Sequence, residues 1–230
     1  KYNPLFESDC RYFIITGGRG SGKSFAVTVF LTLLTMVKGI RVLFTRYTMV
    51  SAHLSIIPEF LQKIGLLGYK DEMFYVNKSE VINTKSKSDI LFRGIKTSAG
   101  NQTASLKSLQ GISCWVLDEA EELIDENTFD TIDLSIREKD IQNRVILILN
   151  PVTKEHWIYD RFFESKGVEG GFNGVKDNVC YIHSTYLDNI ENLSQSFLER
   201  IKSIKHTNFK KYTHKILGGW LDKAEGVVFE

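Results

Sequence analysis

A glycine-rich octapeptide constrains the fold of this chain more than any other feature. Residues 17–24 read Gly-Gly-Arg-Gly-Ser-Gly-Lys-Ser and match the pattern G-x-x-x-x-G-K-[ST]. In such a loop the glycines let backbone N–H groups turn toward phosphate oxygens at the start of a helix, the lysine adds a positive charge, and the serine hydroxyl is available to Mg²⁺. The motif needs a strand before it and a helix after it, and the apolar runs at 12–16 and 25–37 satisfy both conditions. We therefore predict that the phosphates of ATP are bound by Gly17, Gly18, Arg19, Gly20, Ser21, Gly22, Lys23 and Ser24.

Short apolar runs rich in β-branched and aromatic residues recur along the chain, and stretches with helical spacing separate them. The runs are Tyr12–Thr16, Ile40–Thr45, Ile112–Leu117 and Val145–Leu149. This alternation predicts an α/β fold with a mainly parallel sheet flanked by helices. Segments 73–84 and 89–92 are joined by a polar turn, and we expect them to add an antiparallel hairpin to the sheet.

The chain after Asn150-Pro151 is expected to be mostly helical. The spacing predicts a helix over 154–165, a glycine-rich loop, a strand over 179–183, and helical structure over 193–217 that Gly218-Gly219 ends. We expect residues 1–185 to form the core and residues 186–230 a small C-terminal helical subdomain.

Composition excludes several classes of protein. The net charge is only +1, from 29 Lys and Arg against 28 Asp and Glu, so overall charge alone would not hold nucleic acid. The charge is nevertheless uneven, since acidic side chains dominate residues 118–140 and basic ones residues 196–215. Cys10, Cys114 and Cys180 lack CxxC spacing, which argues against a disulfide framework or a zinc site and fits a reducing cytoplasm. The longest apolar stretch is shorter than a membrane span, so we expect no membrane association.

An acidic pair follows the apolar run that ends at Leu117. A nucleotide site of this class needs a carboxylate for Mg²⁺ at the end of a neighbouring strand, so Ser24 and Asp118 are the predicted metal ligands. Glu119 is placed to orient and deprotonate a water for attack on the γ-phosphate. The pair therefore predicts hydrolysis rather than binding alone, although an acidic helix that simply begins here would carry the same residues.

Other nucleotide-binding classes fit less well. A dinucleotide-binding turn needs glycine where Lys23 stands. A GTPase needs Asn-Lys-x-Asp, but the nearest segment, 77–80, ends in Glu80 and precedes the acidic strand. Small-molecule kinases commonly lack the Asp-Glu pair. We therefore expect an ATPase motor.

Asn150 follows the apolar run 145–149 and should lie at the same sheet edge as the acidic pair. Its amide could contact the γ-phosphate or the attacking water, or Asn150 could simply begin an Asn-Pro turn. Position alone leaves these interpretations open.

As a set, the motifs resemble those of the large terminase subunits of tailed double-stranded DNA bacteriophages, the motors that package genomes into capsids. The resemblance covers nearly the whole chain and rests on residues 17–24, 115–122, 134–137, 149–151 with Trp157, 184–189, and 217–220 before 227–229. It implies a RecA-like P-loop NTPase core of the ASCE type with added strands, then a small helical subdomain, then a metal-dependent nuclease domain of RNase H type. The sequence stops at Glu230, about where such a nuclease would begin, so no DNA cleavage is expected from it.

The resemblance also assigns roles to single residues. The motif that couples hydrolysis to movement falls on Asn150, and an arginine used near the γ-phosphate falls on Arg19. The phosphate, Mg²⁺ and catalytic roles fall on Lys23, Ser24, Asp118 and Glu119.

Two further roles stay open. A ring motor implies an arginine supplied by a neighbouring subunit, for which Arg137 and Arg93 are candidates and Lys107 a weaker one, although each is otherwise a surface base. Arg11 and Tyr12 lie shortly before the loop and could stack on adenine, whereas core packing is the simpler interpretation of Tyr12.

We therefore expect an ATP- and Mg²⁺-dependent motor that translocates double-stranded DNA into procapsids. The implied partners are DNA, the portal protein, the small terminase subunit and further copies in a ring, with a monomer in isolation. The implied location is the host cytoplasm, transiently at the portal vertex of the procapsid. DNA would be held through its phosphates by bases of residues 200–215 or of the hairpin. The alternatives are another P-loop DNA translocase or helicase-type ATPase, or a nucleotide-dependent binding module with little turnover.

Overall fold

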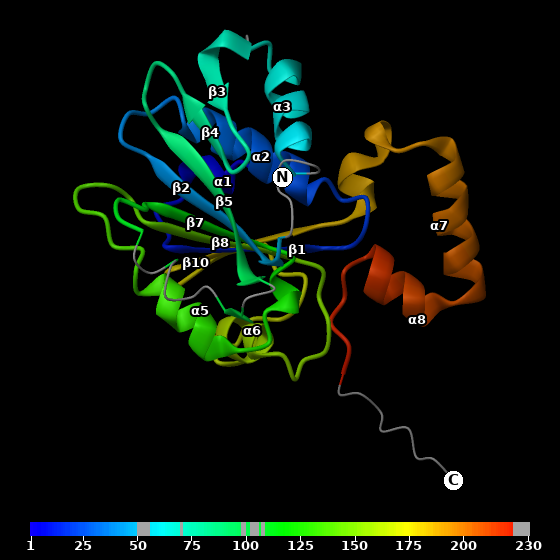
Figure 1. Ribbon diagram of the computed structural model, residues 1–230. Coiled ribbons are helices and arrows are strands. Elements are labelled where there is room, and N and C mark those ends of the chain that lie inside the picture. Colours follow the sequence, from blue (N-terminus) through cyan, green and yellow to red (C-terminus); the bar gives the residue numbers. More distant parts are fainter. Residues whose placement is uncertain (50–55, 70, 98–99, 102–105, 107–108, 223–230) are drawn as a thin grey trace.

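The computed structural model describes residues 1–49, 56–69, 71–97, 100–101, 106 and 109–222 (Figure 1). Lys107 and residues 227–229, named above, lie outside these ranges. The strands are β1 (Tyr12–Gly17), β2 (Arg41–Thr48), β3 (Phe74–Val76), β4 (Glu80–Asn83), β5 (Asp89–Thr97), β6 (Gly100–Asn101), β7 (Cys114–Asp118), β8 (Arg144–Leu149), β9 (Gly174–Lys176) and β10 (Val179–Ser184).

These strands form one sheet in the order β3-β4-β5-β2-β7-β8-β1-β10-β9, with β6 paired to β5. The strands from β5 to β10 in this order are parallel to one another. Antiparallel pairing is confined to β3, β4, β6 and β9. The structure therefore confirms the predicted α/β class, and the four predicted apolar runs fall on β1, β2, β7 and β8.

The predicted hairpin is present but is built differently. Segment 73–84 forms two strands, β3 and β4, because Asn77 interrupts it: its Oδ1 accepts hydrogen bonds from the backbone N–H groups of Ser79 and Glu80 at 2.9 and 3.0 Å. β5 is longer than predicted and pairs with β2 in parallel. The hairpin thus extends the main sheet.

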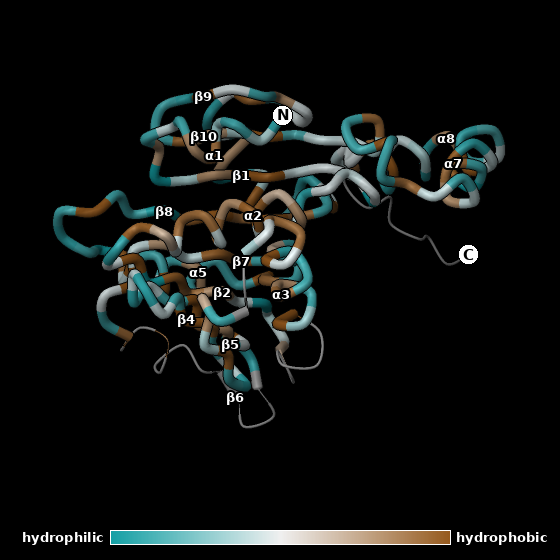
Figure 2. The backbone as a smooth tube through the Cα atoms, turned by 90° about the horizontal axis from the view of Figure 1, so that it is seen from above, coloured by the Kyte–Doolittle hydropathy of each residue, from teal (hydrophilic) through white to brown (hydrophobic). Residues whose placement is uncertain are grey.

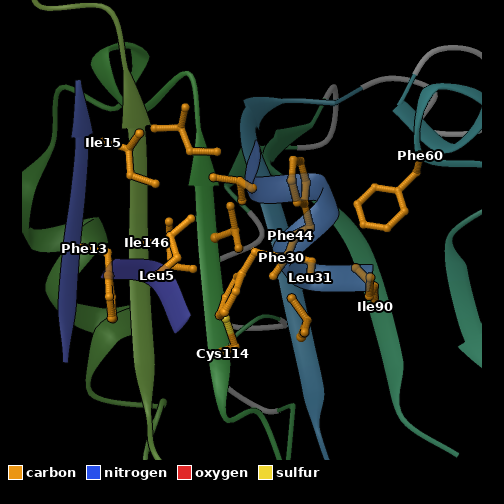
Figure 3. Packing of buried hydrophobic residues seen from close by; sticks show 14 of the residues in the cluster. Leu5, Phe13, Ile15, Phe30, Leu31, Phe44, Phe60, Ile90, Cys114 and Ile146 are labelled. Atoms are coloured by element: carbon orange, nitrogen blue, oxygen red, sulfur yellow. The ribbon is translucent and has the colours of Figure 1, made fainter. Parts of the chain in front are cut away.

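Alternate residues of the central strands pack into two separate apolar layers. In β7, Cys114 and Val116 join one layer, whereas Trp115 and Leu117 join the other. Figure 3 shows the first layer, where side chains of α2 and α3 meet those of the strands. Because both faces are buried, each central strand is apolar throughout. The strands could therefore be predicted from the apolar runs of the sequence. The helices α1 (Pro4–Glu7), α2 (Lys23–Leu34) and α3 (Ile56–Leu66) lie on one side of the sheet, and α5 (Glu126–Asp133) and α6 (Trp157–Tyr159) on the other (Figure 1).

The helix predicted over 154–165 begins later than expected. The His156 side chain accepts a hydrogen bond from the Ile158 backbone N–H and caps α6, which continues into the π-helical turn η4 (Asp160–Glu164). In the described ranges, no helix is both long and apolar enough to cross a membrane.

The C-terminal helices pack around a small apolar cluster of their own, formed by Ile201, Tyr212 and Ile216. Figure 2 shows α7 and α8 beyond the edge of the sheet. The helix predicted over 193–217 is interrupted at Asn208, which leaves helical geometry and caps the next turn by accepting from Lys211 N at 2.8 Å. Gly218, with φ +74°, ends the helical part as predicted. Its elements are η5 (Tyr186–Asn192), α7 (Gln195–Thr207), α8 (Phe209–Lys211) and η6 (Tyr212–Ile216).

The chain returns to the sheet after these helices. Leu221 donates its N–H to Val152 O at 2.8 Å, and its carbonyl accepts from Lys154 N at 2.9 Å. The Trp220 ring packs against the Tyr159 ring with centroids 5.0 Å apart. Residues 220–221 are therefore attached to the stretch that directly follows β8.

Candidate nucleotide-binding site

A pocket of about 280 Å³ opens where the loops after β1, β7 and β8 meet. Parallel strands bring their carboxyl ends to the same edge of a sheet, which is where ligands bind in folds of this class. The pocket is lined by residues 18–25, Arg46, Asp118, Glu119, 148–149 and Asn150. It thus brings together the predicted phosphate, metal and catalytic residues, apart from Gly17, which is buried at the end of β1.

Two loop glycines are required by the backbone itself. Gly22 caps α2 with φ +79°, a left-handed conformation that favours glycine. Gly18 lies against the C-terminal helices, since a Cβ atom there would be 1.9 Å from the carbonyl oxygen of Ile216. The loop is therefore shaped both for phosphate and for close contact with η6.

Lys23 lies at the start of α2 and is only 8% exposed. Its Nζ donates to the carbonyl oxygens of Gly17 and Gly18 at 2.9 and 3.1 Å and to Asn150 Oδ1 at 3.2 Å. Burial lowers the pKa of Lys23 to about 8, although the charges of Glu121 and Asp118 act to raise it. The ammonium group is therefore held mainly by neutral oxygens, and a phosphate would offer it a charged partner.

Asp118 and Glu119 reach the pocket from the end of β7 but differ in their surroundings. Asp118 is 3% exposed, whereas the Glu119 side chain is 45% exposed. Burial raises the pKa of Glu119; Arg46 lowers it, and the charges of Asp118, Glu122 and Glu121 raise it further. Glu119 also has φ +54°, which costs roughly 1–3 kcal/mol for a residue other than glycine and is typical of functional sites. A carboxylate with a raised pKa at the pocket is suited to accept a proton.

Asn150 lies between Lys23 and a second, partly buried carboxylate, that of Glu121. Its Oδ1 accepts from Lys23, and its Nδ2 donates to Glu121 Oε1 at 3.0 Å. The sequence analysis did not single out Glu121, which is three residues beyond Asp118. Burial raises the pKa of Glu121. The amide therefore links the phosphate-loop lysine to the acidic segment after β7.

A family model described as phage terminase large subunit matches residues 9–219. The chain belongs to this family. The large terminase subunit of Bacillus phage SPP1 is 27% identical over 228 residues, which cover 94% of this chain and 50% of that protein. This terminase chain thus spans about half the length of that relative.

Solved terminase structures share the fold. The large terminase of a thermophilic bacteriophage, in complex with ATP-gamma-S, has a TM-score of 0.70 at 16% identity, covering 95% of this chain and 49% of that one. The large terminase ATPase domain of Thermus phage P74-26 has a TM-score of 0.67 at 14% identity, covering 96% and 92%. These similarities confirm the predicted RecA-like fold of the terminase chain.

Arg46 is a residue of this terminase pocket that the sequence analysis missed. Its Nη2 and Nε donate to Asp118 Oδ2 at 2.6 and 2.8 Å, and Nε lies 3.8 Å from Glu119 Oε2. Arg46 comes one residue after the predicted run 40–45, on β2, which pairs with β7. The sequence could have indicated Arg46 as a site residue only if the pairing of β2 with β7 had been known.

The arginines proposed to act on the γ-phosphate lie in different places. Arg19 is exposed and lines the pocket, and its backbone N–H donates to Lys215 O at 3.0 Å. Arg93 lies on β5, where its guanidinium donates to Ser79 O at 3.2 Å. Arg137 is exposed between α5 and β8, near the amino ends of the strands. Neither Arg93 nor Arg137 lines the pocket of its own chain, and their action on a neighbouring subunit stays a prediction.

Arg11 and Tyr12 lie at the opposite edge of the sheet from the pocket. Tyr12 begins β1, and at a rise of about 3.3 Å per residue the phosphate loop is about 17 Å away along the strand. Arg11 Nη2 and Tyr12 Oη instead donate to the carboxylate of Asp133 at 2.7 and 2.8 Å. This position does not favour stacking on adenine at the loop, because residues close in sequence are far apart along an extended strand. It agrees with the simpler interpretation, since Tyr12 packs against the apolar core.

The terminase pocket fits a magnesium ion that is held partly by phosphates. Ser24 and Asp118 offer hard oxygen ligands on the same pocket wall, and Mg²⁺ in proteins is usually bound by one or two carboxylates, waters and substrate phosphates. In the part of the chain that the structure describes, no group of three or more His, Cys, Asp or Glu could hold a metal by itself. Arg46 donates both of its hydrogen bonds to Oδ2 of Asp118. Oδ1 is the carboxylate oxygen that would be left to an ion entering with the nucleotide.

Proposed function

We propose that this terminase domain binds ATP with Mg²⁺ and hydrolyses it. The observation that carries the proposal is the meeting of Lys23, Asp118 and Glu119 at one pocket, although they come from separate segments of the chain. Membership of the terminase family supports the reaction. The ATP-gamma-S complex of the large terminase from the thermophilic bacteriophage supports the nucleotide.

The steps of ATP binding and hydrolysis are assigned to a few residues of the pocket. The loop N–H groups and Lys23 hold the phosphates, and Ser24 and Asp118 would hold Mg²⁺. The ion supplies positive charge to the phosphate oxygens when bound. Glu119 orients a water and takes its proton as the water oxygen attacks the γ-phosphorus, so that ADP and phosphate leave. Arg19, exposed at the pocket, would contact the γ-phosphate.

We propose that residues 1–185 form the ATPase core and that residues 186–230 form a subdomain that responds to the loop. Asn189 Nδ2 donates to Gly20 O at 3.0 Å near the start of the helical part, and Lys215 O accepts from Arg19 N near its end. A loop that changes shape on hydrolysis would therefore displace these helices. In the complete protein this displacement would translocate double-stranded DNA.

Basic side chains make the helical part the proposed DNA contact. The hairpin bases Lys85, Lys87, Arg93 and Lys96 are the alternative contact, since they form no ion pair to an acidic group in the described ranges. Phosphate contacts without base reading suit a motor that accepts any sequence. Within the described residues, no ion pair to an acidic group is formed by the exposed bases Arg200, Lys202, Lys205, Lys210, Lys211 and Lys215.

Further partners are proposed for the complete protein. They are other copies in a ring, with Arg137 or Arg93 reaching a neighbouring site, the portal protein and the small terminase subunit. The working location would be the host cytoplasm, transiently at the portal vertex. Membership of the terminase family supports these proposed partners and this location.

Steady-state phosphate release tests the ATPase proposal. Glu119→Ala is expected to lower kcat by about 100-fold or more, because the water loses its base. Glu122→Ala is the matched control, since Glu122 is exposed in the same acidic segment. Equal phosphate release by wild type and Glu119→Ala would reject the assigned role.

Packaging by the full-length protein tests the motor. Replacing Arg200, Lys202 and Lys205 together by alanine should reduce DNA packaging into procapsids while ATP hydrolysis without DNA persists. Strand separation without packaging would instead identify a helicase-type ATPase.

A further inference from the structure

The amide of Asn150 has only one orientation that satisfies its two partners. An asparagine side chain presents an acceptor oxygen on one side and a donor NH₂ on the other. One side faces Lys23 Nζ at 3.2 Å, and the other faces Glu121 Oε1 at 3.0 Å. An ammonium group can only donate, and an ionised carboxylate can only accept. Oδ1 must therefore face Lys23, and Nδ2 must face Glu121.

This orientation decides what Asn150 offers to the pocket. Asn150 and Lys23 line the pocket, whereas Glu121 does not. The amide therefore turns its acceptor toward the nucleotide side and its donor away from it. The oxygens of an ionised γ-phosphate also only accept hydrogen bonds, so Oδ1 cannot bind them. A water can donate to it.

Glu121 is itself fixed in position. Its backbone carbonyl lies 3.1 Å from His156 Nε2, which holds the main chain. Its carboxylate is directed inward, where Oε2 is buried without a hydrogen-bond partner among the described residues. The bond from Asn150 Nδ2 to Oε1 is the side-chain hydrogen bond that this carboxylate makes in the described part of the chain. Losing it would remove a partner from a carboxylate whose other oxygen already has none, which is costly.

We propose that Glu121 is a positioning residue for ATP hydrolysis. It holds the Asn150 amide with Oδ1 toward the pocket, where Oδ1 accepts from Lys23 in the absence of nucleotide. When Lys23 turns to the phosphates, the same oxygen is free to accept a hydrogen bond from the attacking water. Glu119 would take the proton of that water, and Asn150 would fix its direction. This role rests on the proposed ATPase function.

Three variants separate orientation from charge. Glu121→Gln removes the charge but keeps an acceptor oxygen for Asn150 Nδ2, whereas Glu121→Leu removes both. Glu122→Gln is the control, because Glu122 is exposed and adjacent. Thermal unfolding establishes that each variant is folded. The readouts are kcat and KM for ATP, and the side-chain amide NMR signals of Asn150 in the nucleotide-free protein, assigned by their loss in Asn150→Asp.

We expect Glu121→Leu to lower kcat by about 10- to 100-fold, as misplacement of an orienting group does, with a much smaller change in KM. Glu121→Gln should recover most of this loss. The Asn150 amide signals should be shifted and slow to exchange with solvent in the wild type, and should lose both properties in Glu121→Leu.

The outcomes distinguish the two proposals. With an active wild type, unchanged kcat or unchanged amide signals in Glu121→Leu would overturn the positioning role alone. A Glu121→Gln variant as slow as Glu121→Leu would also overturn it, since charge rather than orientation would then matter. A wild type that releases no phosphate would overturn the ATPase itself, and the positioning role with it.

Discussion

Arg46 neutralises Asp118 by donating two hydrogen bonds to one carboxylate oxygen, from Nη2 at 2.6 Å and from Nε at 2.8 Å. Asp118 is 3% exposed, so without the guanidinium its charge would be left in a medium of low polarity. In the absence of nucleotide, the Arg46 guanidinium thus supplies the positive charge that the buried Asp118 carboxylate needs.

Arg46→Ala is expected to lower the free energy of unfolding of the nucleotide-free protein by about 3 kcal/mol, the cost of leaving a buried charge unpaired. Chemical denaturation measures this loss. Lys166→Ala is the control, because Lys166 and its partner Asp177 are 34% and 56% exposed, so that this pair should contribute little to stability. Mg²⁺ with an ATP analogue should stabilise Arg46→Ala more than the wild type. Equal losses in the two variants would contradict this account.

Lys23 should make stability depend on pH. Burial lowers its pKa from 10.5 to about 8 in the folded protein, so between these values the unfolded chain binds more protons than the folded one. The contribution of Lys23 to the free energy of unfolding should therefore rise as pH increases from about 8 toward 10.5 and should be constant at lower pH. Burial raises the pKa of the Cys114 and Cys180 thiols from 9.0 to about 12 and about 11, so these groups act in the opposite direction above pH 9, and the measured quantity is the difference between wild type and Lys23→Met in denaturation curves across this range. A wild type that loses stability relative to Lys23→Met as pH rises from 8 would refute the assignment.

The same pKa predicts weaker nucleotide binding at high pH. Phosphate needs the protonated ammonium of Lys23, so the affinity for a non-hydrolysable ATP analogue should fall as pH rises through about 8. Calorimetric titration at several pH values measures this. An affinity that stays constant through this range would show that Lys23 binds no phosphate.

Gly18→Ala should disrupt the contact between the loop and η6. The new Cβ would lie 1.9 Å from Ile216 O, so backbone must shift at a cost of about 1–3 kcal/mol. Gly65→Ala is the control, since nothing lies within 4 Å of its Cβ position and alanine favours a helix. Thermal unfolding should show a lower Tm for Gly18→Ala than for the wild type, and no lower Tm for Gly65→Ala.

Tyr12→Phe should lower the stability of the protein without changing its affinity for nucleotide. The variant loses the hydrogen bond to Asp133, worth about 1 kcal/mol. Its affinity for an ATP analogue should equal that of the wild type, because Tyr12 lies at the far end of β1. A weakened affinity would restore the idea that this ring contacts the base.

The sequence predicted those parts of the site whose chemistry is local. The loop residues 17–24 are contiguous, and the acidic pair directly follows a strand that is apolar because both its faces are buried. Arg46 and Glu121 were missed because their roles depend on neighbours in space: β2 lies beside β7, and Glu121 meets Asn150 from another loop. The adenine interpretation of Arg11 illustrates the converse, since a residue close to the loop in sequence lies far from it along β1.

The attachment of residues 220–222 determines where a mechanical load enters the domain. A pull on the chain beyond Asp222 would act first on the Leu221 bridge to residues 152–154 and on the ion pair between Lys154 and Asp222, at 2.6 Å. The attachment precedes the helices α7 and α8 on the path from the C-terminal side, so they would be loaded only after it. The tension would thus reach Val152, two residues after Asn150, so that the load and the proposed hydrolysis act on the same short stretch of backbone.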